Sequence, residues 1–316
     1  MLLRILLGLS VLAAMALGLR PAHAQGTLVI AGGGLKTETL DVWQAFVGAR
    51  PADARTILIV AAASAEPIES ARATGGALYL AGARPEEVEL ACIGLEPPAA
   101  PAECAASTGA DELARIARAG AIWFTGGDQS RITRALRRAD GSDTPLLAAM
   151  RARLKAGAVI GGTSAGAAIM SDPMIASGDA RVALAAPVRR MGVGASGTDS
   201  EGLVLAPGLG FLPGILADQH FGERGRLGRL LVALAERPRT QRLGLGVDED
   251  TAVIIDLARR RATVAGKGRA WVVDARRGRL ATPPLGATEV RLSLATAGQA
   301  IDLRRMTILS PNGARR

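Results

Sequence analysis

The sequence predicts an α/β fold, a doubly wound, mostly parallel sheet with a C-terminal antiparallel β extension. In the first half of the chain, short apolar runs of strand length alternate with longer segments of helical spacing. Two of these runs lead into glycines, at 32–34 and 126–127, and strand ends are where open α/β sheets place ligands. From Thr251 onward the pattern changes to short strands separated by arginine-rich turns, which favours an antiparallel addition.

The N-terminus has the pattern of a secretory signal peptide. Arg4 is followed by a leucine- and alanine-rich run and by Ala-His-Ala at 22–24, a small-x-small cleavage pattern. We therefore expect residues 1–24 to be removed and the protein to be secreted, periplasmic or extracellular. A single domain would cover 25–309, with its β-rich extension at 251–309, and residues 310–316 would form a frayed tail. No other segment is long and apolar enough to span a membrane.

The chain is basic, with 38 Lys and Arg against 29 Asp and Glu. Loss of Arg4 and Arg20 with the signal leaves 36 basic and 29 acidic residues, a net charge of +7. Aromatic residues are sparse and no nucleic-acid-binding motif is present, so we expect no nucleic-acid partner. An arginine-rich exported protein is the simpler interpretation of the charge.

The first βα units follow directly from the pattern. Strands are expected at 27–31, 56–60 and 88–92, and helices at 38–47 and 67–81. The glycines at 32–34 lack the full Gly-x-Gly-x-x-Gly pattern, and no acidic residue ends the second strand, so a nucleotide cofactor is not expected.

A helix at 111–119 leads to a fourth strand at 121–124, which ends in Thr-Gly-Gly-Asp-Gln at 125–129. Two interpretations of this turn remain open. Its glycines can expose backbone N–H groups as an oxyanion hole does, with Gln129 beside them; alternatively, it is a plain turn in which Asp128 caps the next helix. Helices at 129–138 and 145–155 then follow.

The fifth strand ends at a serine with the features of a nucleophile. In Gly-Gly-Thr-Ser-Ala-Gly-Ala (161–167), glycines on both sides of Ser164 permit a sharp turn from strand to helix, which would expose the hydroxyl at the end of the sheet. A serine needs an adjacent base to become reactive. Cleavage of the signal removes His23, so His220 is the one histidine left to act as that base.

His220 ends an apolar run at 214–221 and precedes Arg224, Arg226 and Arg229. On a helix beginning near Phe221, Arg226 and Arg229 would share a face, and such a set can bind carboxylates, although for the arginines taken alone a solvated basic helix face is the better interpretation. A later strand ends in Asp-Glu-Asp at 248–250, and one of these acids could orient the imidazole. Spacing alone does not decide which one.

Two further features concern loops. Cys92 and Cys104 flank a Pro/Ala-rich loop, and an even cysteine count in an exported chain favours a disulfide over a metal site. Residues 171–202 are rich in Gly, Ser, Ala and Asp and weakly periodic, which predicts a long loop or lid. One histidine and two loop cysteines cannot form a credible zinc site, so no metal is expected.

Four segments in this order resemble cyanophycinase, a serine peptidase family that also includes the aspartyl dipeptidase peptidase E. They are Phe-Thr-Gly-Gly-Asp-Gln (124–129), Gly-Gly-Thr-Ser-Ala-Gly-Ala (161–167), Asp-Gln-His-Phe-x-x-Arg-x-Arg-x-x-Arg-Leu (218–230) and Gly-x-Gly-x-Asp-Glu-Asp-Thr-Ala (244–252). The resemblance implies a class-I glutamine-amidotransferase-like, flavodoxin-like fold. It also implies an exopeptidase that degrades cyanophycin, multi-L-arginyl-poly-L-aspartate, to β-Asp-Arg dipeptides without a cofactor.

Site residues carried over by this resemblance fall into three groups. Ser164, His220 and Glu249 would form a catalytic triad, and the N–H groups of Gly127 and Ala165 an oxyanion hole. Substrate would be bound by Gln129, Asp218, Gln219, Arg224, Arg226 and Arg229.

Two alternatives remain open: an aspartyl dipeptidase acting on short Asp-X peptides, and a non-catalytic binding module on the same fold. The spaced arginines favour the polymer-degrading enzyme over the dipeptidase. The sequence does not fix the oligomeric state, and a homodimer stays open.

Overall fold

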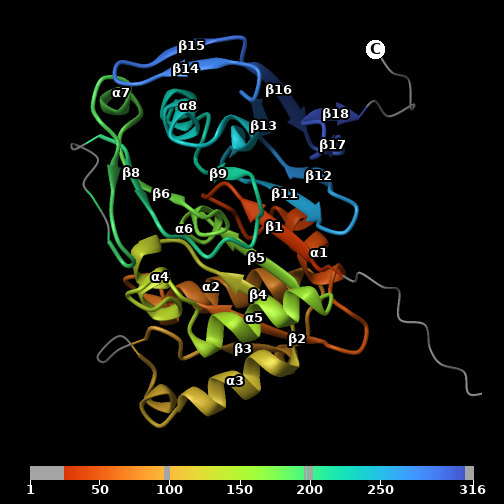
Figure 1. Ribbon diagram of the computed structural model, residues 1–316. Coiled ribbons are helices and arrows are strands. Elements are labelled where there is room, and N and C mark those ends of the chain that lie inside the picture. Colours follow the sequence, from red (N-terminus) through yellow and green to blue (C-terminus); the bar gives the residue numbers. More distant parts are fainter. Residues whose placement is uncertain (1–24, 96–99, 196, 198–201, 310–316) are drawn as a thin grey trace, which may run out of the picture.

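The computed structural model describes residues 25–95, 100–195, 197 and 202–309 (Figure 1). The expected signal peptide and frayed tail lie outside the described residues. Within this part of the chain, no helix has both the length and the apolar content needed to cross a membrane.

A nine-stranded mixed sheet runs through the molecule in the order β18-β17-β12-β11-β1-β5-β4-β2-β3. Its parallel half consists of β1 (Thr27–Ala31), β2 (Thr56–Val60), β3 (Val88–Leu90), β4 (Ala119–Phe124) and β5 (Val159–Thr163). Its antiparallel half consists of β11 (Thr251–Asp256), β12 (Arg261–Gly266), β17 (Ala300–Asp302) and β18 (Thr307–Leu309). The predicted fold class is confirmed: β1 pairs with β5 in parallel and with β11 antiparallel, so the C-terminal extension continues the parallel sheet.

Smaller sheets complete the β structure. A four-stranded sheet, in the order β16-β13-β10-β9, contains β9 (Leu216–Asp218), β10 (Leu243–Val247), β13 (Arg269–Asp274) and β16 (Arg291–Thr296). Strands β6 (Met174–Ser177), β8 (Val204–Ala206) and β7 (Arg189–Arg190) form a third sheet, and β14 (Arg279–Ala281) and β15 (Gly286–Thr288) form a hairpin. The segment expected to be one long loop, 171–202, therefore carries short elements that are too brief to produce a periodic pattern.

Eight α-helices lie in the described part of the chain: α1 (Leu40–Gly48), α2 (Pro67–Leu80), α3 (Gly109–Arg118), α4 (Gln129–Leu136), α5 (Pro145–Lys155), α6 (Ala165–Ala168), α7 (Ala180–Ala183) and α8 (Leu227–Ala235). Those between β1 and β5 lie where the sequence pattern predicts them. Asp128 caps α4, because its carboxylate accepts the Ser130 N–H at 2.8 Å. The helix expected from about Phe221 begins only at Leu227, because His220 and Gly225 have φ angles of 46° and 56° that interrupt helical geometry.

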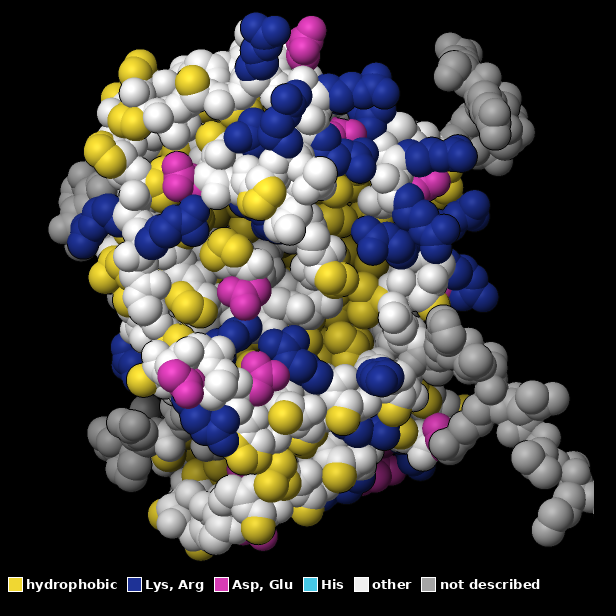
Figure 2. All heavy atoms as spheres, in the orientation of Figure 1, with side chains coloured by type: hydrophobic (Ala, Val, Ile, Leu, Met, Phe, Trp, Pro, Cys, Tyr) yellow, Lys and Arg dark blue, Asp and Glu magenta, His cyan; other side chains and the backbone are white. Residues whose placement is uncertain are grey.

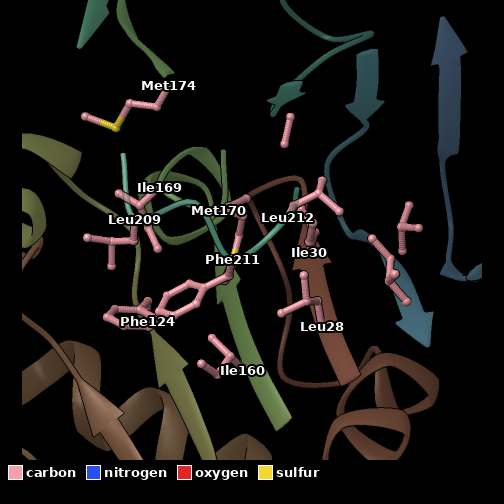
Figure 3. Packing of buried hydrophobic residues seen from close by; sticks show 14 of the residues in the cluster. Leu28, Ile30, Phe124, Ile160, Ile169, Met170, Met174, Leu209, Phe211 and Leu212 are labelled. Atoms are coloured by element: carbon pink, nitrogen blue, oxygen red, sulfur yellow. The ribbon is translucent and has the colours of Figure 1, made fainter. Parts of the chain in front are cut away.

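Alternating side chains bury both faces of the main sheet. On one face, Val29 and Trp123 pack with residues of α1 and α2. On the other, Leu28 and Ile160 join a larger cluster with α5 and the inner face of the four-stranded sheet. Figure 3 shows Phe124, Phe211 and Met170 over this second face, beside Leu28 and Ile160. The parallel strands are thus fixed from both sides.

A disulfide joins Cys92, just after β3, to Cys104, in a short 3-10 turn before α3. It closes the loop that contains residues 96–99, which lie outside the described residues. The Cα atoms of the two cysteines are 5.2 Å apart, within the usual disulfide range.

Basic side chains are prominent on the face that Figure 2 shows. In the view of Figure 2, Lys and Arg side chains outnumber Asp and Glu, and many lie over the C-terminal antiparallel strands. Three arginines of the C-terminal region pair locally: Arg276 and Arg291 both bind Asp274, and Arg259 binds Asp256.

Candidate active site

Ser164 lies at a tight turn between β5 and α6, at the carboxyl edge of the parallel strands. Its φ and ψ are 53° and −110°, an unusual backbone conformation for a residue other than glycine. The flanking glycines permit this turn, because a Cβ on Gly162 would lie 2.6 Å from the Gly166 carbonyl oxygen, and one on Gly166 would lie 2.4 Å from that of Phe124. The local sequence therefore holds Ser164 in a strained turn, half-buried at the lining of a cleft.

His220 lies beside this hydroxyl. It follows β9, and its backbone N–H donates to the Gly32 carbonyl at 2.6 Å. Its Nε2 atom is 2.9 Å from Ser164 Oγ, a distance suited to proton transfer. The residue is 8% exposed, so the imidazole is largely shielded from water.

Glu249 provides the carboxylate that contacts the imidazole. Its Oε1 atom lies 2.5 Å from His220 Nδ1, which leaves Nε2 to face the serine. Asp248 and Asp250 make their contacts with other groups. The choice among the three acids, which spacing left open, thus falls on Glu249 in the structure.

Gly33 and Gly34 also shape this site, and sequence reasoning did not assign them to it. A Cβ on Gly33 would lie 2.2 Å from His220 Cε1, and one on Gly34 would lie 3.0 Å from Glu249 Oε2. Both glycines have positive φ angles, 105° and 54°. The available signal was the glycine triplet at the end of β1, the strand that pairs with β5.

Gly127 and Ala165 flank the serine as the predicted oxyanion-hole residues. Ala165 is the first residue of α6, and Gly127 lies in the turn after β4. Neither backbone N–H donates to an acceptor in the described ranges, so both remain available to a substrate oxygen. Gly127 has a φ of 132°, and a Cβ there would lie 2.1 Å from the Ala63 carbonyl oxygen, which explains why glycine is needed.

A polar cleft of about 440 Å³ opens beside Ser164. Its lining includes most of the predicted substrate-binding residues: Gln129, Gln219, Arg224, Arg226 and Arg229. The Gln129 side-chain amide donates to the Ala176 carbonyl on β6. The Gln219 side-chain oxygen is buried and has no hydrogen-bond partner among the described residues, which leaves an acceptor at the cleft.

The arginines of the cleft differ in what they already bind. Arg229 forms two hydrogen bonds with Asp218, at 2.8 and 2.5 Å, and a third with the Gly178 carbonyl at 2.7 Å. Arg226 donates to the Gln219 carbonyl at 2.6 Å. Arg224 is exposed, and its guanidinium has no ion pair or hydrogen bond to any residue that the structure describes. Arg224 is therefore the cleft arginine with the most donors left for a ligand.

The surroundings of His220 favour its neutral form. Burial lowers the pKa of the imidazole, the hydrogen bond to Glu249 opposes this shift, and the positive charges of Arg224 and Arg226 add to it. The net result is a pKa below the ordinary value of 6.5. A neutral imidazole is the form that can accept a proton from Ser164.

The described residues contain no group of three His, Cys, Asp or Glu side chains arranged to hold a metal ion. The chemistry of the cleft can instead be built from a hydroxyl, an imidazole, a carboxylate and two backbone N–H groups. Such a set activates an oxygen nucleophile for acyl transfer.

Comparison with known proteins places the chain in a family. Residues 105–261 match peptidase family S51. A cyanophycinase from Trichormus variabilis is 32% identical over 314 residues, which cover 94% of this chain and 93% of the relative. A cyanophycinase from Synechococcus elongatus is 36% identical over 201 residues, which cover 61% of this chain and about half, 55%, of the relative.

Among solved structures, the crystal structure of a peptidase from an acI-B1 actinobacterium covers 88% of this chain, with a TM-score of 0.57 and 17% identity. At that identity the likeness concerns the fold alone. The similarity to the Trichormus relative extends over nearly the full length of both proteins. The chain therefore belongs to peptidase family S51.

Proposed function

We propose that this protein is a serine-type exopeptidase that hydrolyses cyanophycin and releases β-Asp-Arg dipeptides. The observation that carries the proposal is the chain of contacts Ser164–His220–Glu249, at 2.9 and 2.5 Å, at the edge of an arginine-lined cleft. The cyanophycinase relatives supply the substrate class.

The first half of the reaction is acylation. His220 Nε2 accepts the Ser164 proton while Oγ attacks the scissile carbonyl carbon, and Glu249 stabilises the imidazolium that forms. The N–H groups of Gly127 and Ala165 bind the resulting oxyanion. The imidazolium then protonates the leaving amine, which leaves an acyl-enzyme on Ser164. In the second half, water attacks the acyl-enzyme with His220 again as the base.

Two side chains of the cleft, Arg224 and Gln219, have hydrogen-bonding atoms that can bind substrate. Each arginine of cyanophycin carries a free α-carboxylate, which the Arg224 guanidinium can bind through two parallel hydrogen bonds. The unpaired side-chain oxygen of Gln219 can accept from the substrate guanidinium. Asp218 is paired with Arg229, so it acts by fixing the Arg229 guanidinium, which also donates to the Gly178 carbonyl.

The test is release of soluble dipeptide from cyanophycin by purified protein, compared with Ser164→Ala. We expect turnover by the wild-type protein and a loss of at least about 10³-fold in the variant, because the nucleophile is gone. Ser142→Ala, at an exposed serine in the turn between α4 and α5, serves as control. Equal turnover in Ser164→Ala would refute the mechanism.

The same assay separates the two other functions. Faster hydrolysis of Asp-X dipeptides than of cyanophycin would indicate an aspartyl dipeptidase. Binding of β-Asp-Arg peptides without turnover, and without modification of Ser164 by a serine-directed reagent, would indicate a binding module.

We further propose that the protein acts outside the cytoplasm. The signal-like N-terminal sequence supports export, and the Cys92–Cys104 disulfide is typical of an oxidising compartment. Cell fractionation followed by N-terminal sequencing should find a chain that begins at Gln25. An uncleaved chain in the cytoplasm would contradict export.

A further inference from the structure

We propose that Asp248 and Asp250, the aspartates on either side of Glu249, are positioning residues: one fixes the loop that carries His220, and the other fixes the loop against which its imidazole packs. The proposal rests on the proposed function, because it assigns all three residues of the Asp-Glu-Asp segment to holding the catalytic imidazole in place. Glu249 contacts the imidazole, and its two neighbours hold the backbone on either side of that imidazole.

Asp248 fixes the loop that carries His220. Its Oδ1 atom accepts the Gly222 N–H at 2.9 Å and the Trp271 indole N–H at 2.7 Å, and its Oδ2 atom accepts the Arg269 N–H at 3.1 Å. Asp248 is 4% exposed, so these bonds form away from water. They join the chain two residues beyond His220 to strand β13.

Asp250 fixes the loop against which the imidazole packs. Its Oδ1 atom accepts the Lys36 N–H at 3.1 Å and the Thr39 hydroxyl, and its Oδ2 atom lies 3.0 Å from Lys267 Nζ. Its own N–H donates to the Gly33 carbonyl at 2.9 Å. Gly33 is the residue whose Cα faces the imidazole ring.

Backbone strain explains why such fixation is needed. His220 and Asp250 have φ angles of 46° and 50°, in the left-handed region that residues with a Cβ seldom adopt. Such conformations persist only where the surroundings hold them. Asp248 accepts the Gly222 N–H, two residues beyond His220, and the side chain of Asp250 accepts from Lys36 and Thr39.

A carboxylate suits this task better than an amide. Asp248 receives three N–H donors, whereas an asparagine offers one acceptor oxygen and would turn its NH₂ group toward a remaining donor. Asparagine at 250 would likewise lose either the Lys267 ion pair or the acceptor for Lys36 and Thr39. Asp248→Asn and Asp250→Asn are thus nearly isosteric variants that weaken one loop each.

The experiment compares these variants with Asp256→Asn. Asp256 ends β11, away from the site. Like the two site aspartates it accepts a backbone N–H, that of Arg259 at 2.8 Å, and it also accepts the Arg259 guanidinium at 2.5 Å. We expect Asp248→Asn and Asp250→Asn to lower kcat on cyanophycin by about 10- to 100-fold per folded molecule, because small displacements of a catalytic group have effects of this size. KM should stay within about threefold, since Arg224 and Gln219 are unchanged, and Asp256→Asn should match the wild type.

A second measurement does not depend on the substrate. The proton shared by His220 Nδ1 and Glu249 Oε1 should give a downfield NMR resonance, which should shift or disappear in both site variants and stay unchanged in Asp256→Asn. Folded variants with wild-type kcat and an unchanged resonance would overturn the inference. If the wild-type protein fails to cleave cyanophycin but the resonance responds as described, the proposed function fails and the positioning role stands.

Discussion

Gly33→Ala should separate the imidazole from the nucleophile without altering either residue. The added Cβ would lie 2.2 Å from His220 Cε1 and 2.3 Å from Nε2, whereas ordinary van der Waals contact begins at 3.4 Å. The ring and the Gly33 backbone must therefore separate by about 1.2 Å. A ring shift of that size directed away from Ser164 would lengthen the Oγ–Nε2 distance from 2.9 Å to about 4 Å, beyond hydrogen-bond range.

The expected consequence is a large fall in kcat with little change in binding. A displacement of about 1 Å can cost about 10²-fold, which corresponds to about 2.7 kcal/mol in the activation free energy. Part of the strain will appear as lower stability, because the φ angle of Gly33 is 105°. The assay is kcat and KM for dipeptide release, normalised to the folded fraction from circular dichroism.

Gly76→Ala is the matched control, since a Cβ there meets no atom within 4 Å and Gly76 lies inside α2. It should keep wild-type kcat and gain about 0.5–1 kcal/mol of stability. A folded Gly33→Ala protein with kcat within about threefold of the wild type would refute the role assigned to this close contact.

Three further predictions follow from the contacts. Arg224→Gln removes a positive charge that helps to hold the pKa of His220 below 6.5. The pH below which a neutral reagent labels Ser164 more slowly, because His220 is protonated, should therefore rise in this variant. A shift of that pH to a lower value would contradict this sign. Replacing Cys92 and Cys104 by serine should lower the free energy of unfolding by about 3 kcal/mol in urea titrations and leave kcat unchanged. The Ser171 hydroxyl accepts the buried Ala217 N–H of β9 at 2.6 Å, and Ser171→Ala removes this acceptor. The free energy of unfolding should fall by about 1–3 kcal/mol in the same titration, and an unchanged value would contradict this prediction.

The parallel half of the sheet could be predicted from sequence because each βα unit is encoded locally. Helix α5, at Pro145–Lys155, matches its expected range, and Thr144 caps it through a hydrogen bond to the Leu147 N–H. The antiparallel character of the C-terminal region was also anticipated, but the division of its strands among three sheets was not. Strand pairing depends on distant partners, which alternation along one strand does not specify.

The catalytic side chains of the site could be predicted, because few residue types can act as nucleophile or base. Contacts that depend on the shape of the backbone could not. The glycines around Ser164 indicated a turn, and the scarcity of histidine pointed to His220. The contact between Gly33 and the imidazole depends on φ angles and on the loop 32–39, which the sequence alone does not define. The turns between His220 and Leu227 were expected to be helical because the spacing of Arg226 and Arg229 fits a helix, yet the positive φ angles of His220 and Gly225 delay its start.

Mass-spectrometric mapping of a serine-directed phosphonate on the native protein tests whether His220 activates Ser164. We expect a single adduct on Ser164, formed at least about 100-fold more slowly in His220→Ala, because the imidazole activates this hydroxyl. An adduct on another serine, or equal rates in the two proteins, would contradict it.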